Sequence, residues 1–348
     1  MSFLDLPGIT PQFVAMNRSR TGGAGLDPFE YERVTGPLTS LHDWPAAFRE
    51  AGLRHHRNAE TYERAGRVRS AGEAYRHASR WFHCAGLLPH PDRALAARTA
   101  AEADAAMDRA MALLEPDSVR LKGPSFTGRL RLPAGAGDRP PSPVVVIVPG
   151  LDSSKEEFHD LADALLARGT AVFAMDGPGQ GALAARTTVR ADYHRVLTEA
   201  VDALESRAEV GAIGVIGLSL GGYYAALGAA HEPRIRAAAT VSGPHRLLWD
   251  ELPPFVTETL AQRAGSPEAA HRFTASVDLR ETASRIPCPL LVVDGGQDIV
   301  PGAENGELLA RDAPHGEYHL VPYGDHLLGN ARPAWLPSTA DWLTARLA

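Results

Sequence analysis

The chain has 348 residues, of which 44% are apolar and 22% charged, a composition typical of globular proteins. Its net charge is −7 and its basic residues are dispersed among acidic ones, which argues against a nucleic-acid-binding protein. The two cysteines, Cys84 and Cys288, lie far apart without metal-ligand spacing, so we expect neither a disulfide framework nor a metal site.

The location of the protein follows from its N-terminus and its apolar runs. Met1–Asp5 lacks the basic segment and the long apolar stretch of a signal peptide. No window reaches the roughly 18 uncharged apolar residues that a membrane span requires. The sequence therefore predicts a cytoplasmic protein without a membrane partner.

The first part of the chain is rich in alanine, arginine and glutamate, which predicts an N-terminal helical cap domain over residues 1–116. The expected helices are Ala46–Ala65, Ser70–Leu88 and Pro91–Leu114, whereas residues 1–40, with their glycines and prolines, are expected to be irregular. The second helix carries an apolar stripe that includes Trp81 and Phe82. Such a stripe indicates a packing face rather than a cofactor site, and it could also bury against a second subunit of a homodimer.

The remaining residues, 117–348, alternate between strand and helix patterns. Val144–Val148 is a short apolar run typical of a buried parallel strand. This alternation predicts an α/β fold with a mostly parallel sheet and helices on both faces. Residues 246–284 contain no clear strand and are interpreted as an excursion between strands. The expected strands are Phe126–Leu132, Val144–Val148, Ala171–Met175, Ile213–Ile216, Ile235–Val241, Leu290–Val293 and Tyr318–Val321, and the expected helices are Asp160–Arg168 and Tyr193–Ala208.

A serine lies at the junction between one predicted strand and the helix that follows it. The segment Gly217-Leu218-Ser219-Leu220-Gly221 has the pattern G-x-S-x-G between the apolar run Ile213–Ile216 and a helical segment. In this context the pattern is typical of the nucleophile elbow of α/β-hydrolases, because a turn this tight leaves no room for side chains at the two glycines. A structural glycine-rich turn is the alternative.

A serine nucleophile needs a histidine base and an acid that orients it, and in this fold they follow in the order serine, acid, histidine. Two aspartates follow the strand Leu290–Val293; Asp298 lies further beyond the strand end and is the expected acid, while Asp294 is interpreted as structural. His326 follows the last strand and is the expected base. His315 and His319, which flank or occupy that strand, are interpreted as structural or exposed.

The charge that develops on a substrate carbonyl oxygen requires backbone N–H donors. One expected donor is the N–H of Leu220, directly after Ser219. The other is the N–H of Leu151, in the loop after Val144–Val148, where Gly150 allows the backbone to approach the substrate.

Two further segments carry a family resemblance that covers most of the chain. Pro149–Glu157 is similar to the G-x-D-S-x-K-E segment, and Asp176–Gly181 to the D-G-P-G-Q-G turn, of one α/β-hydrolase branch. This branch includes 2,6-dihydroxypseudooxynicotine hydrolases, fermentation-respiration-switch-like esterases and fungal polyketide-shortening hydrolases, and its members carry a helical N-terminal domain. The resemblance implies that an acid after the strand following the elbow assists at the substrate carbonyl. Here Asp250 and Glu251 are the candidates, and a solvated or helix-capping acid is the alternative for each. Asp152, Lys155 and Glu156 are interpreted as shaping their loop.

We therefore expect a serine hydrolase that acts on an ester or a 1,3-dicarbonyl-type carbon–carbon bond of a small organic molecule, without a cofactor. The alternative is a lyase or cyclase on the same fold, because related cap-bearing proteins eliminate acetate during tetronate assembly. A non-catalytic binding protein is a third hypothesis; the presence of all three triad residues argues against it.

Overall fold

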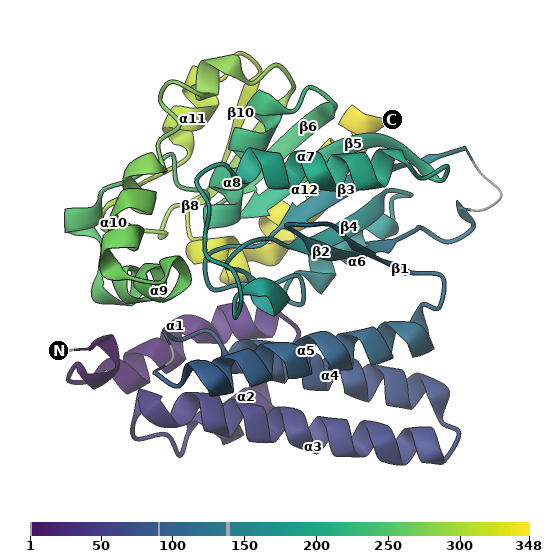
Figure 1. Ribbon diagram of the computed structural model, residues 1–348, viewed down its shortest axis with the longest axis vertical. Helices are drawn as coiled ribbons and strands as arrows, with labels where there is room; N and C mark the ends of the chain where they lie inside the picture. Colours follow the sequence, from purple (N-terminus) through teal and green to yellow (C-terminus); the bar gives the residue numbers. More distant parts are fainter. Residues whose placement is uncertain (1, 90, 137–139) are drawn as a thin grey trace.

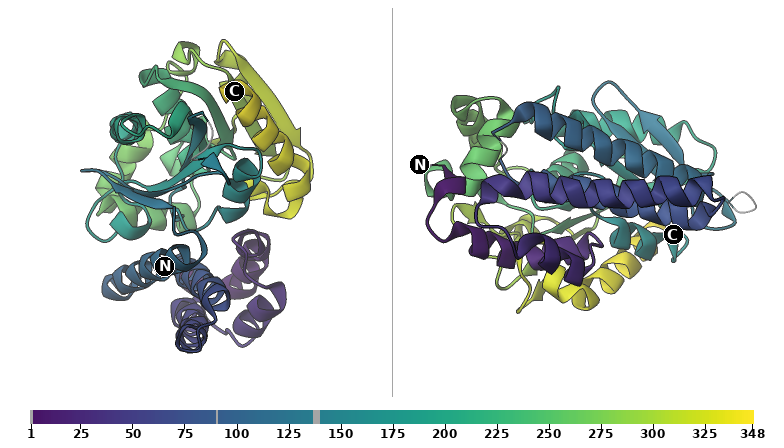
Figure 2. Two further views of the ribbon diagram at one scale, coloured as in Figure 1. Left: turned by 90° about the vertical axis from the view of Figure 1, so that its right-hand side faces the viewer. Right: turned by 90° about the horizontal axis from the view of Figure 1, so that it is seen from below.

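The computed structural model describes residues 2–89, 91–136 and 140–348. A layered α/β region lies above a group of N-terminal helices, which pack beneath it along most of its length (Figures 1 and 2). The chain passes from the last of these helices, which ends at Leu114, to the first strand, which begins at Val119.

The α/β region is built on one sheet of eight strands in the order β1-β2-β4-β3-β5-β6-β8-β10. Strands β3 to β10 of this sheet pair in parallel, whereas β1 and β2 form an antiparallel edge beside β4. The mostly parallel sheet predicted from the sequence is confirmed, with β1 as a short, half-exposed addition. The strands are β1 (Val119–Lys122), β2 (Thr127–Arg131), β3 (Ser142–Val148), β4 (Ala171–Asp176), β5 (Val210–Leu218), β6 (Ile235–Val241), β8 (Leu290–Gly295) and β10 (Gly316–Val321).

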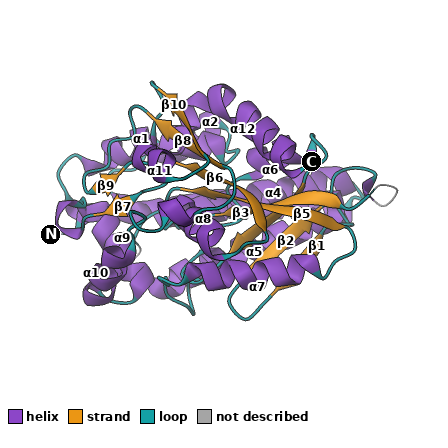
Figure 3. Cartoon of the chain, turned by 90° about the horizontal axis from the view of Figure 1, so that it is seen from above, coloured by secondary structure: helices purple, strands orange, loops and turns teal. Residues whose placement is uncertain are grey.

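Helices cover both faces of this sheet, as expected for parallel strands buried on two sides (Figure 3). Side chains of β3 alternate between the faces: Val144 and Val146 join one apolar core, and Val145 and Ile147 join the other. The first core includes residues of α7 (Tyr193–Glu205), α8 (Leu220–His231) and α11 (Glu307–Asp312), and the second includes residues of α6 (His159–Leu166) and α12 (Arg332–Leu347).

The N-terminal helices have an aromatic core of their own. Trp44 stacks on Phe48 with ring centroids 3.9 Å apart, and Trp81 packs against the same Phe48 ring. Trp81 and Phe82 are each only 1% exposed, so this stripe packs within the chain and is not available to a second subunit. The helices are α1 (Ile9–Gly23), α2 (Pro28–Thr35), α3 (Trp44–Arg64), α4 (Val68–Ala85) and α5 (Arg93–Leu114). In the described part of the chain, no helix is both long and apolar enough to cross a membrane.

The prediction that residues 1–40 are irregular is wrong, because α1 and α2 occupy most of this segment. Helix α1 lacks a clear apolar stripe and ends in glycines, so it is stabilised by packing against the rest of the protein rather than by its own pattern. Helix α2 does carry a local signal: the Asp27 carboxylate caps the N–H of Glu30, and Pro28 stands in the first turn.

The segment 246–284 also differs from the expectation, since it contains the two-residue strand β7 (Arg246–Leu247), paired with β9 (Ala303–Glu304). Helices α9 (Pro254–Ala264) and α10 (Pro267–Ser276) follow. The Phe255 ring on α9 lies 5.1 Å from the Phe3 ring and 5.6 Å from the Phe13 ring, so this segment connects the two regions of the protein. Short helical turns occur at η1 (Phe3–Asp5), η2 (Leu41–Asp43), η4 (Gly181–Leu183), η5 (Trp249–Glu251), η6 (Ala283–Arg285) and η7 (His326–Ala331).

Candidate active site

The turn between β5 and α8 holds Ser219 in a backbone conformation that residues other than glycine rarely adopt, with φ 55° and ψ −128°. A Cβ atom at Gly217 would lie 1.8 Å from the carbonyl oxygen of Gly221, and one at Gly221 would lie 2.2 Å from that of Val148. Only glycine fits at both positions. The close packing predicted for the G-x-S-x-G turn is therefore confirmed.

Three side chains from the carboxyl ends of three strands meet beside this turn. Nε2 of His326 lies 3.0 Å from Oγ of Ser219, and Nδ1 of His326 lies 2.9 Å from both carboxylate oxygens of Asp298. The structure thus brings together the serine, histidine and aspartate selected from the sequence. This is the geometry of a nucleophile, a base and an orienting acid; the catalytic roles themselves stay predictions.

His326 and Asp298 shift each other's pKa value. Partial burial lowers the pKa of His326, but the adjacent Asp298 carboxylate raises it by more, so the pKa lies above its ordinary value of 6.5. Burial raises the pKa of Asp298, while His326 and a hydrogen bond from Ser242 lower it by more. Asp298 is therefore a carboxylate near neutral pH, and it stabilises the protonated form of His326.

The loop that carries His326 is strained and held in place by one hydroxyl. Leu327 and Leu328 both have positive φ angles, 66° and 50°. Oγ of Ser242, at the end of β6, accepts a hydrogen bond of 3.0 Å from the N–H of Leu327. Since Ser242 also contacts Asp298, one side chain fixes both the acid and the loop of the base.

The loop after β3 lies directly against Ser219. A Cβ atom at Gly150 would lie 3.0 Å from the Cβ atom of Ser219, which explains why a glycine is needed next to the serine. Leu220 is the first residue of α8, so its N–H has no acceptor within the helix. Within the described residues, the N–H of Leu151 has no hydrogen-bond acceptor either. Both predicted oxyanion donors are therefore available.

Gln180 fixes the backbone of this loop. Its amide Nε2 donates a hydrogen bond of 2.5 Å to the carbonyl of Pro149, and its Oε1 accepts from the N–H of Gly177 and the hydroxyl of Tyr193. Gln180 is only 1% exposed, and its contacts explain why a glutamine occupies the D-G-P-G-Q-G turn. No role of Gln180 was predicted from the sequence.

Helix α1 reaches the same loop through a buried arginine. Arg20 donates to the Asp152 carboxylate at 2.8 Å and to the Glu157 carboxylate at 2.7 Å. Its neighbour Ser19 donates a hydrogen bond to Asp325, the residue before His326. The N-terminal helix therefore contacts both the loop of the predicted oxyanion donors and the loop of the predicted base. No local pattern revealed Arg20, because its segment was predicted to be irregular.

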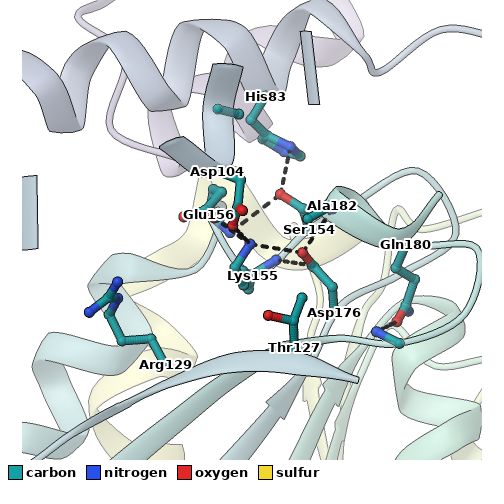
Figure 4. Close-up of polar contacts among 12 residues, drawn as sticks. His83, Asp104, Thr127, Arg129, Ser154, Lys155, Glu156, Asp176, Gln180 and Ala182 are labelled. Carbon is teal, nitrogen blue, oxygen red and sulfur yellow. Dashed lines mark hydrogen bonds and ion pairs between the residues drawn. The ribbon is translucent and has the colours of Figure 1, made fainter. Parts of the chain in front are cut away.

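A second buried cation connects this loop to α5 (Figure 4). Nζ of Lys155 lies 2.7 Å from carboxylate oxygens of Asp104 and Glu156 and 2.9 Å from that of Asp176. Burial raises the pKa of Glu156 to about 7, although Lys155 opposes this shift. Asp104 belongs to α5 and Asp176 ends β4, so Lys155 links the helical region to the sheet. These contacts fit the interpretation of Lys155 and Glu156 as residues that shape the loop.

Among the described residues, no hydrogen bond joins the other candidates, Asp250, Glu251 and Asp294, to Ser219, Asp298 or His326. Asp250 and Glu251, on η5, are exposed, and neither side chain forms a hydrogen bond or ion pair with another described residue. Asp294 accepts a hydrogen bond from the N–H of Gly306. Across the described ranges, no group of three or more His, Cys, Asp or Glu side chains is placed to hold a metal ion.

Comparison with known proteins shows to which family this chain belongs. The family model described as serine aminopeptidase S33 matches residues 139–268. The 2,6-dihydropseudooxynicotine hydrolase of Paenarthrobacter nicotinovorans is 32% identical over 246 residues, which are 68% of this chain and 66% of that protein. The 20-hydroxy-prefusarin hydrolase FUS2 of Gibberella moniliformis is 33% identical over 248 residues, 63% of this chain and 58% of that protein.

Solved structures agree over a larger part of the chain. The crystal structure of 2,6-dihydroxy-pseudo-oxynicotine hydrolase has a TM-score of 0.78 and 27% identity, and covers 97% of this chain and 95% of its own. AbyA5 has a TM-score of 0.69 at 19% identity, with 97% of this chain and 99% of its own covered, which shows a shared fold. The chain belongs to the α/β-hydrolase family of enzymes, in which its relatives include 2,6-dihydropseudooxynicotine hydrolase.

Proposed function

We propose that this protein is a serine hydrolase that cleaves an ester or a 1,3-dicarbonyl-type carbon–carbon bond of a small organic molecule. The observation that carries the proposal is the 3.0 Å contact between Oγ of Ser219 and Nε2 of His326, on an imidazole whose other nitrogen faces Asp298. A serine hydroxyl becomes a nucleophile when such a base accepts its proton.

In the proposed reaction, Oγ of Ser219 attacks the substrate carbonyl carbon while His326 accepts the hydroxyl proton. The N–H groups of Leu151 and Leu220 donate hydrogen bonds to the oxyanion that forms. His326 then gives its proton to the leaving group, an alcohol oxygen or the carbon of an enolate. Water, deprotonated by the same histidine, hydrolyses the acyl-enzyme and regenerates Ser219.

The kind of substrate is proposed from the relatives. Their names describe hydrolases of small organic molecules, 2,6-dihydropseudooxynicotine and 20-hydroxy-prefusarin. Since the alignments span 66% and 58% of these two proteins, the substrate of this chain is proposed only as a class, a small molecule of secondary metabolism. An assisting role for Asp250 or Glu251 also stays a proposal.

The first prediction concerns the nucleophile. Ser219→Ala should abolish turnover of 4-nitrophenyl esters and labelling by a fluorophosphonate probe, because no other group can form the acyl-enzyme. The thermal unfolding midpoint should be unchanged, which serves as the control for folding. Full activity of Ser219→Ala would contradict the mechanism. For a natural substrate, incorporation of ¹⁸O from labelled water into the carboxylate product supports hydrolysis, whereas product without the label would indicate elimination or cyclisation.

The second prediction concerns pH. Protonated His326 cannot accept the proton of Ser219, so kcat/KM should fall as the pH drops below the raised pKa of His326, with the midpoint above pH 6.5. Asp298→Asn removes the carboxylate that raises this pKa, so the midpoint should move to lower pH. At neutral pH kcat should fall by about 10³- to 10⁴-fold. A pH profile with an unmoved midpoint would show that Asp298 is not the partner of the base.

The third prediction concerns Gln180, which we propose as a positioning residue for the loop of Leu151. Gln180→Leu removes the donor to the Pro149 carbonyl and should lower kcat by about 10- to 100-fold, because one oxyanion donor is displaced. KM should change much less. Gln12→Leu, at an exposed glutamine of α1, is the matched control. Equal effects on kcat and KM would indicate a general loss of structure instead.

A further inference from the structure

A cavity of about 140 Å³ lies between the N-terminal helices and the α/β region. Asp152 and Ser153, the residues after Leu151, form part of one wall, and Arg263 from the last turn of α9 forms part of another. Helix α5 contributes small apolar side chains, Ala96, Ala97, Ala100 and Ala103. The cavity therefore has an apolar side and a charged side.

The acidic groups of the charged side already have partners. Both carboxylate oxygens of Asp152 accept hydrogen bonds from Arg20. The carboxylate of Asp176 accepts from the backbone N–H and the Nζ of Lys155 and from the N–H of Ala182 (Figure 4). Both carboxylates therefore already have a cationic partner other than Arg263.

Arg263 is different, because its guanidinium has no hydrogen-bond or ion-pair partner among the described residues. Its Nε is fully buried. Burial lowers the pKa of Arg263, and the negative charges of Asp152 and Asp176 only partly offset this at a distance. An arginine keeps its charge under these conditions, so its buried Nε–H requires an acceptor that the described residues do not supply.

We propose that Arg263 binds an anionic group of the substrate that carries two oxygen atoms, either a carboxylate or an ionised 1,3-dicarbonyl. The planar guanidinium matches such a group with two parallel hydrogen bonds. The alanine face of α5 accommodates the apolar part of the same molecule. Because Asp152 directly follows Leu151, this subsite adjoins the oxyanion loop. The inference rests on the proposed function and specifies its substrate class as a small organic acid.

The kinetic test compares two activated esters of equal chain length, neutral 4-nitrophenyl valerate and mono-4-nitrophenyl glutarate. The wild type should prefer the glutarate ester, and Arg263→Met should lower kcat/KM for that ester by about 10- to 100-fold. The valerate ester should change less than about two-fold. Arg263→Lys, which keeps the charge but not the planar fork, should restore part of the preference. Arg272→Met, at an exposed arginine on α10, is the control for loss of charge.

A binding test separates the two anion classes and does not depend on turnover. Calorimetric titration of Ser219→Ala with glutarate, and separately at alkaline pH with ionised 2,4-pentanedione, an acyclic dione whose two oxygens can converge, should show binding of at least one anion. Adding Arg263→Met to Ser219→Ala should abolish this binding. Binding of glutarate alone identifies a carboxylate site, and binding of the dione alone identifies an enolate site. Binding of neither, or binding that survives Arg263→Met, would overturn the proposal.

Stability distinguishes a binding residue from a structural one. Arg263→Met replaces an unpaired buried cation with an apolar side chain, so its thermal unfolding midpoint should be unchanged or higher. A lower midpoint with equal losses on both esters would also overturn the proposal. If the wild type hydrolyses neither ester and the probe does not label Ser219, the proposed function fails, while the binding titration still tests the anion site.

Discussion

A buried lysine and a largely buried arginine hold the loop after β3 between the N-terminal helices and the sheet, and the geometry of the site depends on them. Arg20 pairs with Asp152 from the helical side, and Lys155 pairs with Asp104 and Asp176. Removal of Lys155 would leave the buried Asp176 carboxylate without its cationic partner, at a cost of about 3–5 kcal/mol. The loop that presents the N–H of Leu151 is therefore fixed by the helical region as much as by the sheet.

The helical region does not only pack against the α/β region; it also contacts the loops that carry the predicted reacting groups. Helix α1 contacts the oxyanion loop through Arg20 and the loop of His326 through Ser19, while α5 contacts the same oxyanion loop through Asp104. Helices α4 and α5 also line the cavity that Arg263 faces. The interface that holds the loops of Leu151 and His326 thus also forms the cavity proposed for the substrate. We infer that activity and substrate choice depend on one packed interface.

The fold, and the meeting of Ser219, Asp298 and His326 at one place, were predictable from local patterns. Short apolar runs mark the buried parallel strands before Ser219 and Asp298, and His326 follows the less buried strand β10. The role of Arg20 was not predictable, because α1 is stabilised by distant contacts and carries no clear apolar stripe. The role proposed for Arg263 was likewise not predictable, because its lack of a partner is a property of the folded chain. Neither residue belongs to a local sequence pattern, since the residues around it in the fold lie far away in the sequence.

The central claim is that Ser219 attacks a carbonyl whose oxygen is bound by the N–H groups of Leu151 and Leu220. It is tested most directly by a crystal structure of the covalent adduct with a 4-nitrophenyl alkylphosphonate, a mimic of the tetrahedral intermediate. The account predicts a phosphorus–Oγ bond at Ser219 and a phosphoryl oxygen about 2.7–3.1 Å from both backbone nitrogens. An adduct at another residue, or a phosphoryl oxygen directed away from this loop, would contradict it.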